Sequence, residues 1–167
     1  MLDTTIFNRI LDDMIDLGSF RGVPVFVTHI QLDEIERTRD EKRKRALLRV
    51  FRDVPKESLP TSSTMLGLSR LDHAKLGDDA NTFKKMLKRL QELDRKKHKT
   101  LTAENQARDI LIGETALKEG LTIITEDSNL AQVVIEFGGS ASTLGNALTV
   151  LRPTRNGLAR SRGAAET

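Results

Sequence analysis

Asp109 and Asp127 stand where carboxylates can do chemistry. One helical face, which should be packed inward, carries Asp109 together with three small or apolar residues, Ile112, Gly113 and Ala116. Asp127 follows the apolar run 121–125, and open, mostly parallel sheets place their sites at the carboxyl ends of strands. If the two carboxylates converge there, a divalent cation is the natural compensating charge. The alternative is that Asp109 forms a structural ion pair with Arg108 or another cation.

Two further acids occupy comparable positions earlier in the chain. Asp3 ends a very short apolar segment and precedes a helix. Glu34 lies within two turns of the end of a second apolar run, 22–28. Asp33 is its immediate neighbour, about 100° around the helix, so on sequence alone either acid can face the pocket.

Carboxylates with room for water suit Mg²⁺ or Mn²⁺, which prefer oxygen ligands. A bound ion of this kind makes a nucleophile of water and stabilises the leaving oxygen of a phosphodiester. Few other chemistries compete with this one. The chain has no cysteine and three scattered histidines, and its glycines lack the spacing of a phosphate-binding loop.

The elements that must position these acids can be read from apolar periodicity and capping residues. Thr100 or Thr102 can begin a helix that Gly120 ends, and a short buried strand follows to Thr125. Earlier, a helix closed by Gly18 precedes a strand over 22–28, and Thr28 caps the next helix. Strands alternating with helices predict an α/β fold.

The remaining segments complete a single domain over residues 1–151. We expect helices along the basic run 37–52 and around Phe83–Leu90 and Leu130–Phe137, with edge strands near 64–69 and within 140–151. Residues 152–167 lack apolar periodicity and predict a disordered tail.

The net charge of +3 hides an asymmetry. Residues 37–52 contain eight Lys or Arg against two acids, and residues 84–99 repeat that ratio. Such runs are often only solvated helix faces, but here they suit the delivery of a polyanion to an acidic pocket. The candidate nucleic-acid contacts are Lys42, Arg43, Lys44, Arg45, Lys84, Lys85, Lys88 and Arg89.

Four blocks of the chain resemble the PIN-domain family of metal-dependent ribonucleases, which includes the VapC-like toxins of toxin–antitoxin pairs. The blocks are Leu2–Thr5, Thr28–Ile35, Asp109–Leu117 and Ile124–Asp127. The resemblance runs from residue 1 to about residue 137, and its last two blocks in tandem are the more specific ones.

The resemblance implies a three-layer α/β/α fold with a central, mostly parallel sheet of four to five strands. It also implies an endoribonuclease whose catalytic metal ligands are Asp3, Glu34, Asp109 and Asp127, binding Mg²⁺ or Mn²⁺, with Thr5 and Thr125 as polar supports. The expected partners are RNA and an antitoxin-like protein inhibitor, and a homodimer is left open.

Two departures from the family pattern are visible, because the first strand is unusually short and residues 53–83 match no family signature. One alternative is a non-catalytic PIN-like module that binds nucleic acid or a partner. Another is a phosphatase of the haloacid-dehalogenase type, whose motif needs a second Asp where this chain has Thr5. Nothing resembles a signal peptide and no apolar run reaches membrane length, so we expect a cytoplasmic protein without membrane contact.

Overall fold

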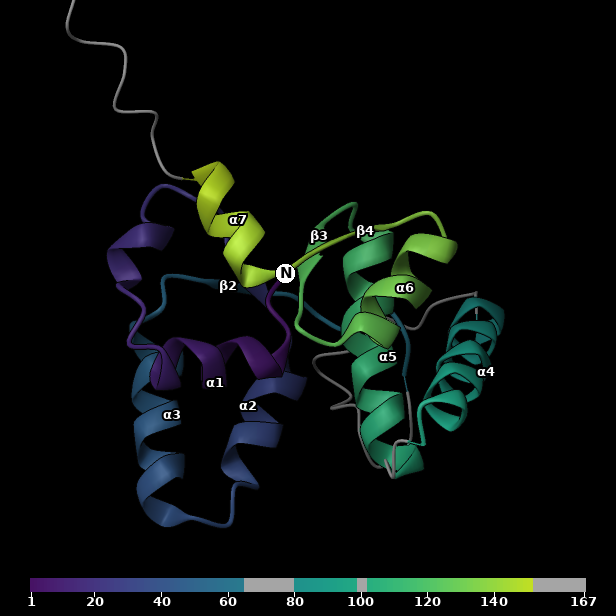
Figure 1. Cartoon of the computed structure of the whole chain (residues 1–167), viewed down its shortest axis with the longest axis horizontal. Helices are drawn as coiled ribbons and strands as arrows, with labels where there is room; N and C mark the ends of the chain where they lie inside the picture. Colours follow the sequence, from purple (N-terminus) through teal and green to yellow (C-terminus); the bar gives the residue numbers. More distant parts are fainter. Residues whose placement is uncertain (65–79, 99–101, 152–167) are drawn as a thin grey trace, which may run out of the picture.

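The computed structural model describes residues 1–64, 80–98 and 102–151, and Figure 1 shows two groups of helices on either side of a few short strands. In these ranges the elements are α1 (Thr4–Asp12), the 3-10 helix η1 (Leu17–Phe20), β1 (Phe26–Val27), α2 (His29–Glu36), α3 (Glu41–Asp53), β2 (Glu57–Ser58), α4 (Ala80–Lys96), α5 (Ala103–Lys118), β3 (Thr122–Ile124), α6 (Ser128–Glu136), β4 (Ser140–Ser142) and α7 (Leu144–Leu151). None of these helices is long and apolar enough to cross a membrane.

The strands of the described residues form two short parallel pairs. β1 pairs with β2 in the register Phe26 to Glu57, and β3 pairs with β4 in the register Thr122 to Ser140. The expectation of an α/β fold with parallel pairing is therefore confirmed. The expected central sheet of four to five strands is not formed as one regular sheet in this part of the chain.

The segment that ends in Asp3 lies between these two pairs. Its Leu2 amide donates to the Phe26 carbonyl at 2.9 Å, and its Asp3 amide donates to the Ile124 carbonyl at 2.9 Å. In return the Ile124 amide donates to the Met1 carbonyl at 2.8 Å. These backbone bonds hold β1 and β3 on opposite sides of one short extended segment.

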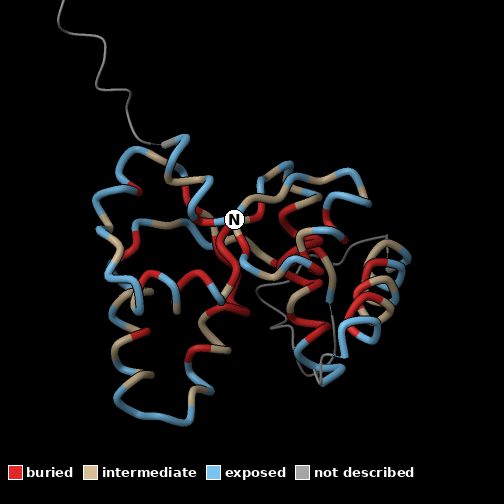
Figure 2. Tube along the Cα trace, viewed as in Figure 1, coloured by how far each residue is buried: buried red, intermediate tan, exposed pale blue. Residues whose placement is uncertain are grey.

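Two hydrophobic cores lie on the two sides of this segment, and Figure 2 shows buried residues along it and along the helices around it. The first core gathers apolar side chains of α4, α5 and α6, including Met86 and Ile110, and it also contains Met1. The second core gathers side chains of α1, α3 and β1, including Phe7, and it contains Leu2. Because side chains of an extended segment alternate between faces, consecutive residues serve the two cores.

The stretch from α5 to α6 follows the sequence prediction closely. The Thr102 hydroxyl caps α5 by accepting from the Asn105 amide at 3.2 Å. Gly120 has a φ of +64°, the left-handed conformation that ends a helix at little cost for glycine. Asp127 caps α6 after a strand of three residues. The boundaries of α5 and the start of α6 thus follow from local sequence signals.

Two helix boundaries differ from the prediction. The first helix ends at Asp12 rather than Gly18, because Met14 adopts a φ of +46° and is 88% exposed, outside the apolar stripe. The basic run is not one helix with α2, because Asp40 starts a new helix by accepting from the Lys42 amide at 2.8 Å. The chain therefore turns within the basic run, between Arg37 at the end of α2 and Asp40 at the start of α3.

Other differences concern the smallest elements. The predicted edge strand within 140–151 is confined to β4, and α7 follows it. The strand β2 was not predicted, since both of its side chains are exposed and polar. The edge strand expected near 64–69 lies almost wholly outside the described residues, as does the predicted tail 152–167.

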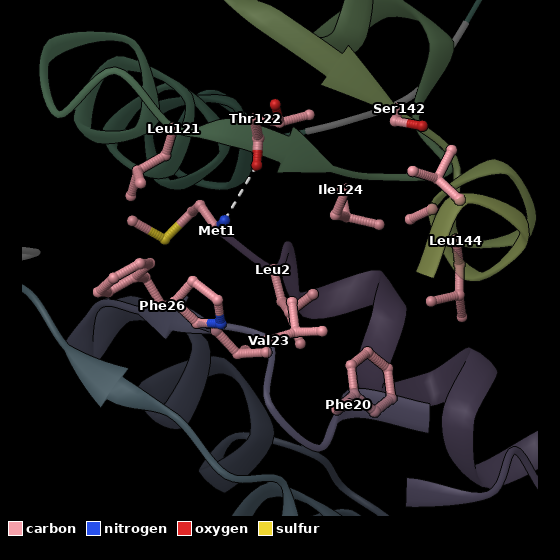
Figure 3. Close-up of a pocket in the computed structure, with 14 residues that line it drawn as sticks. Met1, Leu2, Phe20, Val23, Phe26, Leu121, Thr122, Ile124, Ser142 and Leu144 are labelled. Atoms are coloured by element: carbon pink, nitrogen blue, oxygen red, sulfur yellow. Dashed lines mark hydrogen bonds between the residues drawn. The ribbon is translucent and has the colours of Figure 1, made fainter. Parts of the chain in front are cut away.

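An apolar groove of about 440 Å³ runs along the strands, and its lining includes Ile124 and Ser142, the last residues of β3 and β4. Phe20, Phe26 and Leu121 are among its walls, and the Met1 amino group donates to the Thr122 carbonyl at 3.0 Å inside it (Figure 3). None of the four predicted acids lines this groove.

Candidate active site

A pocket of about 380 Å³ lies at the carboxyl ends of β3 and of the segment that ends in Asp3. Its lining includes all four predicted acids, Asp3, Glu34, Asp109 and Asp127. They come from four places that are far apart in the sequence: the first residues, α2, α5 and the start of α6. The parallel arrangement brings them to one edge, as expected for a strand-end site.

Asp3 is the most deeply held of these acids, with 2% of its surface exposed. One carboxylate oxygen caps α1 by accepting from the Thr4 amide at 2.7 Å. The other accepts from the hydroxyls of Thr5 at 2.6 Å and Thr125 at 2.7 Å, so both predicted supporting residues contact Asp3. Burial raises the pKa of Asp3, and the hydrogen bonds oppose that rise without cancelling it.

Glu34, and not its neighbour Asp33, is in the pocket lining. Thr28 and Gln31 form a capping box that fixes the start of α2, so the rotation of the helix is set before Glu34 is reached. The Thr4 hydroxyl donates to the Glu34 carboxylate. Burial raises the pKa of Glu34 to about 7, and the nearby Asp3 adds to the rise.

Asp109 carries the strongest electrostatic conflict in the pocket. Burial raises its pKa well above the ordinary value, and the carboxylates of Asp3, Glu34, Asp127 and Asp94 raise it further, in that order. The neighbouring Arg108 turns its guanidinium to Glu104 and Asn105. The structural ion pair that Arg108 offered as an alternative is therefore directed away from Asp109.

Asp127 is shared between the pocket and the start of α6. Its carboxylate accepts from the Asn129 amide at 2.8 Å and the Leu130 amide at 3.3 Å. Its own amide donates to the Thr125 hydroxyl at 3.0 Å, and that hydroxyl donates to Asp3. Thr125 thus links two of the four acids through one side chain.

The donor set of the pocket matches a hard divalent cation in chemistry, because it consists of carboxylate and hydroxyl oxygens. Its arrangement is more open than a finished metal cage. In the described ranges, no group of three or more His, Asp or Glu side chains is placed to hold a metal ion. The residues therefore fit Mg²⁺ or Mn²⁺ by type, while the acids remain spread over the walls of the pocket.

Sequence reasoning missed a buried polar cluster behind the pocket. Asp94 of α4 is 1% exposed and accepts from the Gln106 amide group at 2.7 Å and the Asn129 amide group at 2.7 Å. These contacts fasten α4, α5 and α6 together near Asp109. The sequence carries no signal for this cluster, because its three members share no spacing.

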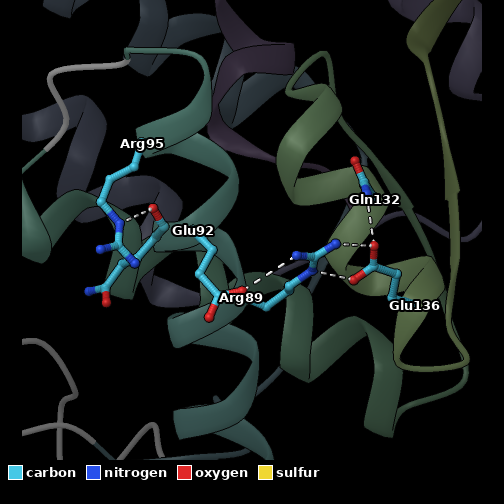
Figure 4. A network of polar contacts seen from close by, with 6 residues as sticks. Arg89, Glu92, Arg95, Gln132 and Glu136 are labelled. Carbon is cyan, nitrogen blue, oxygen red and sulfur yellow. Dashed lines mark hydrogen bonds and ion pairs between the residues drawn. The ribbon is translucent and has the colours of Figure 1, made fainter.

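The eight basic residues predicted to contact nucleic acid divide into two kinds. Three of them have acidic partners within the chain: Arg43 with Asp12, Lys44 with Glu41, and Arg89 with Glu92 and Glu136. Figure 4 shows the last of these networks, in which the Arg89 guanidinium lowers the pKa of Glu136 to about 2. The other five are exposed: Lys42, Arg45, Lys84, Lys85 and Lys88.

Comparison of the chain with protein-family models, curated proteins and solved structures found no match. What the chain does must accordingly be argued from its own residues. The four acids in one pocket, the hydroxyls that hold Asp3 and the exposed basic faces are the observations available for that argument.

Proposed function

We propose that this protein is a metal-dependent endoribonuclease of the PIN type, with Asp3, Glu34, Asp109 and Asp127 binding Mg²⁺ or Mn²⁺. The observation that carries the proposal is the meeting of these four acids in the lining of one pocket, where burial and the other three carboxylates raise the pKa of Asp109. Such a group of carboxylates is costly without a compensating cation. A divalent ion is the partner that this donor set suits best.

The proposed reaction is hydrolysis of a phosphodiester. The ion, when bound, lowers the pKa of a water molecule and steadies the leaving oxygen. The protein's own part is to hold the acids in place: Thr5 and Thr125 fix one oxygen of Asp3, and Thr4 fixes one oxygen of Glu34. RNA as the substrate follows from the family resemblance.

The backbone bonds of the first residues support a PIN-like arrangement. In this proposal the segment ending in Asp3 is the central strand of a five-stranded order, with β1 and β2 on one side and β3 and β4 on the other. The helices then form layers on its two faces. An antitoxin-like inhibitor that places a cation among the four acids is part of the same proposal.

A nuclease assay tests the function directly. Labelled single-stranded RNA is incubated with the protein in Mn²⁺, in Mg²⁺ and in excess EDTA, and cleavage should occur only with metal. Asp109→Asn should lower the rate by orders of magnitude. Asp33→Asn is the matched control, since Asp33 neighbours Glu34 outside the pocket lining, and it should cleave at close to the wild-type rate. Robust cleavage in EDTA would refute the proposal.

A second candidate is a module that binds nucleic acid without hydrolysing it. The observation that favours it is the absence, among the described side chains, of three acids already gathered to hold a metal. This candidate predicts retained RNA binding with no cleavage in either Mn²⁺ or Mg²⁺. The same assay, read with a binding measurement, therefore separates the two functions.

A further inference from the structure

Three charged residues form a clasp at the pocket mouth: Arg37, Glu104 and Arg108. The Arg37 guanidinium donates to Oε1 of Glu104 at 3.0 Å. The Arg108 guanidinium donates to the same oxygen, and also to Oδ1 of Asn105 at 3.2 Å. Both arginines line the pocket that contains the four acids. Two cations thus share one anionic oxygen beside the proposed metal site.

The clasp joins the two sides of the pocket. Arg37 ends α2 on one side, while Glu104 and Arg108 lie in the first turns of α5 on the other. The Arg108 side chain is only 7% exposed, whereas those of Arg37 and Glu104 are 53% and 55% exposed. A guanidinium as buried as that of Arg108 requires an anionic partner. The Glu104 carboxylate is this partner, and because its side chain is exposed it can move away from Arg108 into solvent.

A phosphate group fits the place that the Glu104 carboxylate occupies. Guanidinium groups bind carboxylates and phosphates through the same planar fork of donors, so one anion can replace the other. Arg37 and Arg108 line the same pocket as the four acids, so a phosphate held by the clasp would share that pocket with the acidic site. A phosphodiester is favoured over a protein carboxylate as the occupant of this place. Its oxygens can contact the two arginines and a neighbouring cation at the same time, and it contains a bond that the proposed site can hydrolyse.

We propose that Arg37 and Arg108 bind a backbone phosphate of single-stranded nucleic acid, and that Glu104 occupies this phosphate site in the free protein. The inference rests on the proposed function for the class of substrate. It adds a binding subsite to the acids and makes Glu104 an internal competitor of the substrate. Arg37 and Arg108 are positioning residues, since they orient the phosphate rather than react with it.

Binding of a labelled single-stranded RNA, measured by fluorescence anisotropy across a salt series in EDTA, tests the subsite without requiring cleavage. Arg37→Gln should weaken binding and make the log–log salt slope less negative by about 0.7, the value for one phosphate contact on a single strand. Arg21→Gln, an exposed arginine outside the pocket and outside both basic runs, is the control and should leave affinity and slope unchanged.

Glu104→Gln gives the sharper test because the expected change is a gain. Removing the competing carboxylate should tighten RNA binding by about two- to fivefold, the scale of one exposed ion pair. Arg108→Lys keeps the positive charge of the buried side chain, so the variant should still fold. It loses the planar fork of the guanidinium, so it should bind RNA more weakly than the wild type. A thermal melt of each variant verifies the fold.

Wild-type affinity and salt slope in both Arg37→Gln and Glu104→Gln would overturn the inference. Tighter binding of a polyglutamate peptide, but not of RNA, by Glu104→Gln would overturn it in favour of a protein partner. Either result leaves metal-dependent cleavage intact. RNA cleavage that needs no metal ion would refute the proposed function. The binding measurements on the clasp would still stand in that case.

Discussion

Asp109 and Glu34 make the stability of the metal-free protein depend on pH. Both carboxyl groups have raised pKa values in the folded state, about 7 for Glu34. At pH values between the ordinary pKa and the raised pKa of each group, the folded protein binds more protons than the unfolded chain. The free energy of unfolding should therefore rise as the pH falls from 8 to 5.

Asp109→Asn should remove part of this dependence. At pH 8 in EDTA the variant should be more stable than wild type by about 0.5–2 kcal/mol, the usual scale of a stability–activity trade-off. The difference should shrink as the pH falls through the raised pKa of Asp109, because the wild-type carboxyl then becomes protonated. Urea unfolding at a series of pH values measures both effects.

Asp12→Asn is the control of opposite sign, because Arg43 holds the pKa of the Asp12 carboxyl below its usual range. This variant should gain no stability at pH 8. A clear loss of stability in Asp109→Asn at pH 8 would instead make Asp109 a structural ion-pair partner.

At the scale of single residues, the candidate acids were accessible from sequence because each one stands beside a strand end or a capped helix. The choice between Asp33 and Glu34 was not accessible, because it depends on the contact that Thr4 makes across the pocket. The clasp was missed for a similar reason. Glu104 and Arg108 have the i, i+4 spacing of a helical ion pair, but nothing in the sequence places Arg37 beside them.

At the scale of elements, two helical glycines should respond oppositely to the same substitution. A Cβ at Gly113 of α5 would lie 3.0 Å from Cγ2 of Val134 and 3.2 Å from Cδ1 of Leu130, both on α6. A Cβ at Gly145 of α7 would meet no heavy atom within 4 Å. Gly113 is therefore a contact point between two helices, and Gly145 is open.

Gly113→Leu should lower the free energy of unfolding by about 1–3 kcal/mol through overpacking against α6. Gly145→Leu should raise it by about 0.5–1 kcal/mol through better helix propensity. Urea unfolding of the two variants gives the comparison. Equal effects at the two positions would show that α5 and α6 are not packed as tightly as the structure has them.

Prediction succeeded for elements whose ends are marked by capping residues in the local sequence. It failed for elements whose ends depend on contacts with residues far away in the sequence. The unit α5–β3–α6 has a cap at each end and a clear period, whereas α7 is eight residues long and contains glycine, asparagine and β-branched residues. The lengths of the strands were overestimated, because the sequence shows apolar runs but not how few residues of each run pair. β1 and β2, for example, pair over only two residues each.

For the whole molecule, the exposed basic residues of α3 and α4 should govern the salt dependence of RNA binding. Lys42 and Arg45 lie on α3, and Lys84, Lys85 and Lys88 lie on α4. Replacing either set by glutamine should make the log–log salt slope less negative, by roughly 0.7 for each phosphate contact removed. Salt titrations of RNA binding measure this change.

Arg21→Gln is the control for both sets, because Arg21 is exposed at the end of η1, next to Phe20 of the apolar groove. Its salt slope should equal that of the wild type. If replacing the α3 set leaves the log–log salt slope unchanged, those residues form a solvated surface that does not contact RNA. The same conclusion would hold for the α4 set. Arg89 is left out of the α4 set, because its substitution would also break the ion pair with Glu136.

The hydrogen bond from Thr125 to Asp3 spans 122 residues of sequence, and it has a consequence for the order in which the protein is made. A ribosome that adds about 5–20 residues per second needs on the order of ten seconds to cover that separation. Until then the first residues have no β3 to pair with, and Asp3 has neither Thr125 nor Asp127 beside it. Under the proposed function, the nascent chain carries its acids apart from one another, and the hydrolytic centre forms only after Thr125 and Asp127 have been added.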